Sequence, residues 1–205
     1  MMPPFEDLPT LYEPHLKRAG RVLDIIERAY RRRSESLGFH CAGCEDNCCL
    51  TRFHHHTVGE YLYLREGFFR LTVRHRARIL DRARDVNEIH REAGGHGPPV
   101  RAMCPLNEEG RCLLYRRRPM ICRLHGIPYE FRRPDGGRME GPGCDAFHRR
   151  TGRDNGYRFD RTPYYREMAL MERDLRAAVG FSGRMKMTVA EMVETFFGSA
   201  SGEAT

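Results

Sequence analysis

All eight cysteines of this 205-residue chain lie in its middle, and four of them fall within nine residues. Residues 1–40 and 145–205 contain none. Cysteines used only for packing would be spread over several helices, whereas cysteines clustered along the chain are typical of metal-binding sites. The pattern therefore favours a metal centre, whose candidate ligands are Cys41, Cys44, Cys48, Cys49, Cys104, Cys112, Cys122 and Cys144.

Disulfides are the first alternative, because small secreted domains use them to replace a missing core. The N-terminus Met-Met-Pro-Pro-Phe-Glu-Asp has neither the basic nor the apolar region of a secretory signal. No run approaches the ~18 consecutive apolar residues of a membrane span. We therefore expect a cytoplasmic protein without membrane association, in which thiols stay reduced and this spacing indicates metal binding or catalysis.

The formal net charge of +7 is compatible with an acidic partner, including nucleic acid. No zinc-finger spacing and no RNP motif supports nucleic-acid binding, so the expected partner is an unidentified protein or redox partner. The chain contains no legible Ser-His-Asp order, carboxylate pair or phosphate loop. The sequence therefore leaves open whether the protein is an enzyme.

Helices are predicted on the N-terminal side of the central region. Apolar residues recur at steps of three and four over residues 12–35, which indicates an amphipathic helix that ends before Gly38. The segment Thr57-Val-Gly-Glu60 has the form of a capping box and predicts a second helix. That helix would pause near Gly67, and a longer one would follow to about residue 92.

Residues 100–150 look irregular, with a tight turn over residues 107–110 and a short helix beginning at Pro119. Residues 129–131 and 138–140 are predicted to pair as a hairpin. Beyond this region, Thr162 is expected to be the N-cap of a helix that has Pro163 at its first position and runs to residue 179. A capping box at Thr188 predicts a last helix. Residues 199–205 are expected to be a loose tail.

The predicted fold is therefore mainly α, with a loop-rich, metal-stapled cysteine centre, a possible small β-hairpin and a single domain. Residues 1–39 would form the N-terminal helix, residues 40–150 the cysteine-cluster region and residues 151–205 the C-terminal helices. The centre has few apolar residues with which to offset backbone entropy of ~1–2 kcal/mol per residue. Metal binding, worth ~10–16 kcal/mol in zinc-finger peptides, would supply the difference.

The cysteine spacing suggests how the ligands divide. A C-x₂-C turn lets Cys41 and Cys44 converge on one metal, and Cys48 is close enough to join them. Neighbouring side chains in extended backbone point to opposite faces. Cys49 would therefore serve a second metal, together with the group at residues 104–144. Eight thiols also divide into two four-coordinate sites, as in closed zinc sites and iron–sulfur clusters.

Soft thiolates suit both zinc and iron–sulfur chemistry. Zinc would be favoured by two C-x₂-C pairs, but the chain has only one. We therefore favour an iron–sulfur cluster, of the [4Fe-4S] type, over zinc.

The cysteine segments resemble the YkgJ-type cysteine-cluster family, described as a zinc- or iron-chelating domain with a CxxCxxCC signature. Residues 41–49 match that signature with one extra residue in the second gap. Residues 104–123 are similar to the family block "CPFL…G-x-C-x-I-Y-x-x-R-P-x-x-C-R". The resemblance covers about residues 40–145 and implies that all eight cysteines are ligands. It implies no reaction; one branch resembles flagellin lysine N-methylases, but no glycine-rich loop for S-adenosylmethionine is found.

Histidines and arginines near the cysteines are secondary candidates. Residues 54–56 are three consecutive histidines before a helix cap, and we expect them to be exposed. Arg118 and Arg123 flank Cys122, where they would either stabilise thiolates or form ordinary ion pairs. Three histidines beside cysteines are alternative nitrogen ligands: His40, His125 and His148.

Two functions from different classes follow. The favoured one is an iron–sulfur protein with a redox, electron-transfer or sensing role, in which the metal takes part in the chemistry. The alternative is a zinc-stabilised module that binds a protein or nucleic-acid partner, in which the metal only supports the scaffold.

Overall fold

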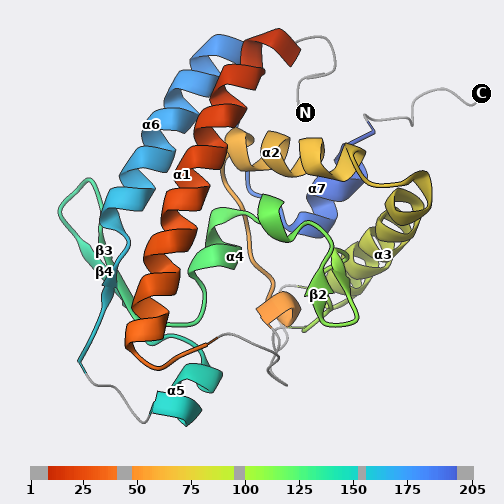
Figure 1. Cartoon of the computed structure of the whole chain (residues 1–205). Helices are drawn as coiled ribbons and strands as arrows, with labels where there is room; N and C mark the ends of the chain where they lie inside the picture. The colour runs from red at the N-terminus through yellow and green to blue at the C-terminus, as the bar shows by residue number, and fades with distance from the viewer. Residues whose placement is uncertain (1–8, 41–47, 95–99, 152–155, 198–205) are drawn as a thin grey trace, which may run out of the picture.

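The computed structural model describes residues 9–40, 48–94, 100–151 and 156–197, and over these ranges the chain is mainly helical (Figure 1). The predicted mainly α class is thus confirmed. None of the helices in these ranges is both long enough and apolar enough to cross a membrane.

The long helices α1 (Pro9–Ser36) and α6 (Thr162–Val179) lie side by side and run in opposite directions (Figure 1). The predicted N-terminal helix is confirmed, although it begins at Pro9. Its apolar stripe is buried, and Gly38 follows it with φ +65°, the left-handed conformation that glycine adopts without steric cost. This pair of helices forms one side of the molecule.

Helix α2 (Val58–Phe69) is mostly internal, with nine of its twelve residues buried. Thr57 caps it, since its hydroxyl oxygen accepts the Glu60 N–H at 3.1 Å. The predicted pause near Gly67 is wrong, because the helix runs through Gly67 to Phe69. A Cβ at Gly67 would lie 2.6 Å from Cγ of Arg117, so the glycine permits close packing rather than a break.

The predicted capping box of α2 is only half formed. The Glu60 carboxylate turns inward, where it accepts the Thr57 hydroxyl at 2.6 Å and the Met120 N–H at 2.8 Å. The next orphan amides of the helix, Val58 and Gly59, donate instead to the Glu172 carboxylate at 2.8 and 3.0 Å. A residue of α6 therefore completes the N-terminal cap of α2.

Helix α3 (Val73–Glu92) packs against α7 (Val189–Thr195) on the other side of the molecule (Figure 1). The capping box of α7 is complete: Thr188 Oγ1 accepts the Glu191 N–H at 3.2 Å, and the Glu191 carboxylate accepts the Thr188 N–H at 2.6 Å. The predicted last helix is confirmed. The tail, residues 199–205, lies outside the described residues.

The centre combines small elements with turns. Strands β1 (Asn107–Glu108) and β2 (Arg111–Cys112) pair across the predicted turn, and α4 (Met120–Leu124) follows Pro119 as expected. The predicted hairpin is also present, as β3 (Tyr129–Arg132) and β4 (Arg138–Gly141).

Two features of this region were not foreseen. Strand β5 (Phe159–Asp160) pairs in parallel with β3. Thr162 was expected to cap α6 but is its first helical residue, and its hydroxyl accepts the Arg132 N–H at 2.9 Å. The helix α5 (Asp145–Thr151) lies between β4 and β5 in the chain.

One hydrophobic core joins the helices to the centre. The prediction that the centre has few apolar residues of its own to bury is wrong, because five residues between 100 and 150 are at most 6% exposed: Leu106, Leu114, Leu124, Ile127 and Phe147. Side-chain packing thus stabilises the described part of the centre. A metal staple there stays a prediction.

Candidate metal centre

Two distant cysteine segments meet through their backbones. Cys48 and Cys49 lie in a 3₁₀ turn, Cys48–Leu50, and the Cys104 N–H donates a hydrogen bond to the Cys49 carbonyl at 2.8 Å. The β1–β2 hairpin then places Cys112 opposite Asn107. The following helix, α4, carries Cys122.

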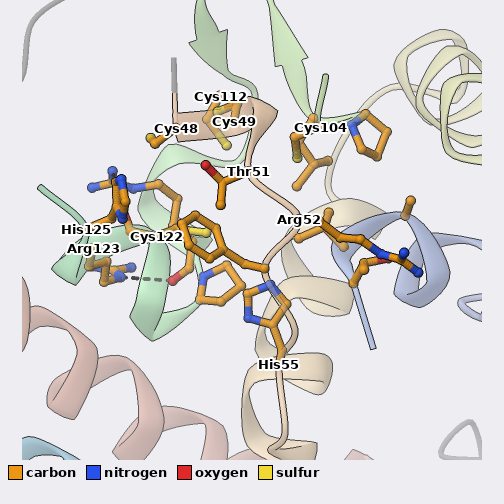
Figure 2. Close-up of a pocket in the computed structure, with 18 of the residues that line it drawn as sticks. Cys48, Cys49, Thr51, Arg52, His55, Cys104, Cys112, Cys122, Arg123 and His125 are labelled. Atoms are coloured by element: carbon orange, nitrogen blue, oxygen red, sulfur yellow. Dashed lines mark hydrogen bonds between the residues drawn. The ribbon is translucent and has the colours of Figure 1, made fainter. Parts of the chain in front are cut away.

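Five cysteines line one cavity of about 560 Å³. Figure 2 shows Cys112 and Cys49 at the top of the view, with Cys48 to their left, Cys104 to their right and Cys122 below them. The fold therefore gathers cysteines from two distant parts of the sequence, residues 48–49 and residues 104–122. No family resemblance is needed to see this grouping.

Three of these thiols are held in their neutral form by burial. Burial raises the pKa of Cys104 to about 12 and the pKa of Cys112 to about 11, and it raises that of Cys122 well above its ordinary value. Neighbouring thiols raise each pKa further; both Cys112 and Cys49 do so for Cys104. Loss of these protons requires a compensating positive charge, which a metal ion supplies.

Cys49 has the opposite character. A hydrogen bond from the Cys48 thiol lowers the pKa of Cys49 to about 6 against the effect of burial, and the Asn107 side chain and the charge of Arg118 lower it further. Cys49 is therefore a thiolate at neutral pH. The sequence identified Asn107 only as part of a turn, since its approach to Cys49 depends on the β1–β2 pairing.

The arrangement fits a metal in its donor chemistry but not in its geometry. Soft thiols dominate the cavity wall, as zinc or an iron–sulfur cluster requires. Within the described ranges, however, no three or more His, Cys, Asp or Glu side chains are placed so that they could hold one metal ion. The thiols share a cavity without forming a coordination sphere.

Cys48 and Cys49 were assigned to different metals because an extended backbone would point their side chains to opposite faces. The structure does not have that backbone at these residues. Their backbone forms a 3₁₀ turn rather than an extended strand, and the two side chains are hydrogen-bonded to each other. Cys41 and Cys44, the other proposed ligands of the first site, lie outside the described residues.

Cys144 stands apart from the cavity wall. It precedes α5, where its backbone N–H donates to the Gly126 carbonyl at 2.8 Å and its sulfur accepts the Phe147 N–H at 3.4 Å. The thiol thus acts as a helix cap. The structure does not bring it to the five cysteines that line the cavity.

The expectation that the three consecutive histidines are exposed is wrong for His55, which is 2% exposed. Its backbone pairs with Met187 in both directions, at 2.7 and 3.0 Å, and this pairing draws the segment inward. Burial, assisted by His56 and His54, lowers the pKa of His55 to about 4. The imidazole is therefore neutral at pH 7. No local sequence pattern indicates the long-range pairing of His55 with Met187.

The other candidate histidines differ in position. His125 lines the cavity, with its ring 5.2 Å from that of Phe53. His40 is exposed, and its carbonyl accepts a hydrogen bond from Arg150. His148 lies in α5 beside Phe147. Of the three, only His125 faces the cysteines of the cavity (Figure 2).

Arg118 and Arg123 link the cysteine-bearing helix α4 to α1 through Glu27. Arg118 donates to the Glu27 carboxylate at 2.9 and 3.0 Å, and Arg123 donates to it at 3.2 Å. Arg118 also lowers the pKa of Cys49 and of Cys112. Both readings of Arg118, as an ion pair and as a charge beside thiols, therefore apply.

Arg123 has a structural role. It is 4% exposed and donates to the carbonyls of Arg116 at 2.6 Å and Arg118 at 2.9 Å, in addition to its contact with Glu27. These hydrogen bonds fix the loop that precedes Cys122.

Comparison of the chain with models of known protein families, with curated proteins and with solved structures finds no match. The resemblance to the YkgJ-type family therefore stays a prediction from the motifs.

Proposed function

We propose that this chain is a cysteine-cluster metal-binding protein that holds an iron–sulfur cluster of the [4Fe-4S] type and serves in electron transfer or redox sensing. The observation that supports the proposal is the convergence of five cysteines from two distant parts of the sequence on one cavity. Cys49, Cys104, Cys112 and Cys122 are the four whose thiols act on one another electrostatically, so they are the proposed first ligand set. Bound there, the cluster would supply one-electron chemistry.

The remaining residues have defined parts in this proposal. Cys48 supports the thiolate form of Cys49 by its hydrogen bond, and Arg118 adds positive charge near an anionic cluster. The buried thiols exclude water from most of the ligand set, which affects the reduction potential of such clusters. The participation of Cys41, Cys44 and Cys144 remains part of the eight-ligand prediction.

The alternative is a zinc-stabilised module for a protein or nucleic-acid partner. It is supported by the way the cysteine segments are tied into the scaffold, through the Cys104–Cys49 backbone hydrogen bond and the Arg123 contacts. In that case the metal would be structural, and the positive charge of the chain would serve binding.

Purification without oxygen, followed by analysis of iron, zinc and acid-labile sulfide, distinguishes the two. We expect a brown protein with iron and sulfide. A colourless protein with stoichiometric zinc, unchanged by iron–sulfur reconstitution, would support the zinc module instead. Cys112→Ser should lower the metal content, and the metal content of Cys144→Ser tests separately whether a cysteine outside the cavity is also a ligand. Equal metal in wild type and Cys112→Ser would contradict the proposed ligand set.

A further inference from the structure

The cavity extends beyond its cysteines to a second group of polar side chains. In Figure 2 Arg52 lies on the right of the view and His55 at the bottom, away from the labelled cysteines at the top and left. His90, from α3, lines the cavity as well. The electrostatic neighbours also divide: Arg118 acts on the thiols, whereas Arg52 acts on His90. The cavity thus has a part that the cysteines do not use.

His55 has unmet hydrogen-bonding capacity in this second part. It is 2% exposed, and neither of its ring nitrogens has a hydrogen-bond partner among the described residues. The nearest carboxylate oxygen, of Glu60, is 3.9 Å from Nδ1, beyond hydrogen-bond distance. A neutral imidazole carries one donor and one acceptor, and burying either without a partner costs about 1–3 kcal/mol. A polar group that enters the cavity would satisfy them.

His90 shows the same property independently. Both of its ring nitrogens are inaccessible to solvent and have no hydrogen-bond partner in the described part of the chain. Desolvation lowers the pKa of His90, and the positive charge of Arg52 lowers it further. Two neutral imidazoles from different elements therefore line the same cavity.

The charges of the cavity wall select an anion. Arg52 forms no ion pair with any described residue, although it lines the cavity. Among the residues that line the cavity, Glu27 is paired with Arg118 and Arg123, and Arg111 is a further cation. Glu191 does not line the cavity, although its negative charge partly offsets the effect of Arg52 on His90. The wall thus retains positive charge.

Apolar side chains form part of the wall beside these polar groups. Phe53, Val86, Ala102, Leu106, Val189 and Ala190 all contribute to it. The whole cavity, with its cysteine-lined part included, has a volume of about 560 Å³, and sites for small organic molecules typically measure ~300–1,000 Å³. Phe53 adds an aromatic face on which a flat ligand can pack.

We propose that this second part of the cavity binds a small organic anion with a flat apolar body. Arg52 pairs with the anionic group, His55 and His90 supply hydrogen bonds, and the apolar wall covers the body. The site goes beyond the proposed metal centre and does not depend on which metal the cysteines hold, because none of these groups is a cysteine.

A matched pair of probes tests the proposal: 2-naphthoate and its uncharged isostere 2-naphthamide. Isothermal titration calorimetry with the full chain, purified without oxygen and with its metal content measured, gives both affinities. We expect one 2-naphthoate per chain and about tenfold weaker binding of 2-naphthamide, the ordinary effect of losing a charge-assisted hydrogen bond. Absence of saturable binding, or equal affinities of the two probes, would overturn the proposal.

Variants locate the site. Arg52→Gln and His55→Phe should each weaken 2-naphthoate binding by about fivefold or more. Arg74→Gln changes an exposed arginine of α3 outside the cavity and should leave binding unchanged. Arg52 is exposed, so Arg52→Gln tests the proposal even where His55→Phe unfolds the chain. Equal loss in Arg52→Gln and Arg74→Gln would show a non-specific charge effect and refute the site. Because metal content is measured separately, failure here leaves the metal centre to its own test.

Discussion

The Cys104 backbone N–H is hydrogen-bonded to the Cys49 carbonyl at 2.8 Å. This contact joins the cluster of cysteines near the end of α1 to the segment that carries the other cysteines of the cavity. It uses main-chain atoms, so it places the two side chains near each other without consuming either thiol. The thiols of Cys49 and Cys104 remain available as ligands, and four predictions follow from this arrangement and its surroundings.

Cys49→Ser should remove more metal than Cys48→Ser. Cys49 acts electrostatically on Cys104, Cys112 and Cys122, whereas Cys48 acts on Cys49 by hydrogen bonding. We expect Cys49→Ser to lose most of the metal that Cys49 would bind together with Cys104, Cys112 and Cys122. The double variant should have about the same metal content at this centre as Cys49→Ser. The measurement is metal and sulfide per chain for all three variants. A Cys48→Ser chain that loses this centre while Cys49→Ser retains it would contradict the assignment.

Removal of the metal should loosen the centre and leave much of the helical structure. Metal binding to the folded form alone stabilises it, but α1, α2 and α6 also pack against one another through buried apolar side chains such as Leu23, Leu64 and Leu175. We expect a fall in Tm of about 10 °C or more, equivalent to a few kcal/mol in a chain of this size. Circular dichroism with and without a strong chelator under reducing conditions measures it. An unchanged Tm, with metal loss verified, would show that the centre does not stabilise the fold.

Glu172→Gln should destabilise the protein through the start of α2. The carboxylate accepts hydrogen bonds from the Val58 and Gly59 amides and also contacts Arg176. The neutral amide offers one acceptor oxygen in place of two, so about 1–3 kcal/mol of unfolding free energy should be lost. Urea denaturation measures this loss. Glu167→Gln, on the exposed face of the same helix, is the control and should change little.

His55 should make stability depend on pH below neutrality. Its folded pKa, about 4, is depressed by burial from an ordinary value near 6.5, so the unfolded chain binds the proton more tightly. This contribution is fully present above pH 6.5 and is lost as the pH falls from 6.5 towards 4, by ~3 kcal/mol in all.

The difference between wild type and His55→Phe isolates that contribution from the carboxyl groups. Unfolding free energies should fall more steeply between pH 6.5 and pH 4 in wild type than in His55→Phe. His56→Gln, at an exposed neighbouring position, removes only the smaller contribution of His56 to the pKa of His55, so its curve should stay closer to wild type than that of His55→Phe. Parallel curves for wild type and His55→Phe would show that His55 does not titrate in this way.

Local signals predicted much of the fold. The Thr188 capping box, the turn before Arg111 and the short helix after Pro119 all formed, because each depends on residues a few positions apart. The clustering of the cysteines along the sequence was likewise visible from the sequence alone.

The rest depends on contacts between distant segments. Glu172 caps a helix 113 residues away from it, at Gly59, and the backbone pairing of His55 with Met187 buries a side chain that its polar neighbours suggest is exposed. An extended backbone was expected from the sequence at Cys48 and Cys49, but the structure has a 3₁₀ turn there. The spacing of apolar residues within one segment does not indicate which distant segment it will contact.

The contribution of α7 to the cavity wall, through Val189 and Ala190, has a consequence for the order of events in the cell. Ribosomes release these residues long after Cys122, so a nascent chain already carries the thiols of the wall while that side of the cavity stands open. The complete cavity wall can form only after α7 has been synthesised. A metal or ligand therefore enters the cavity either before α7 has completed its wall or afterwards. A chain truncated before α7 distinguishes the two cases.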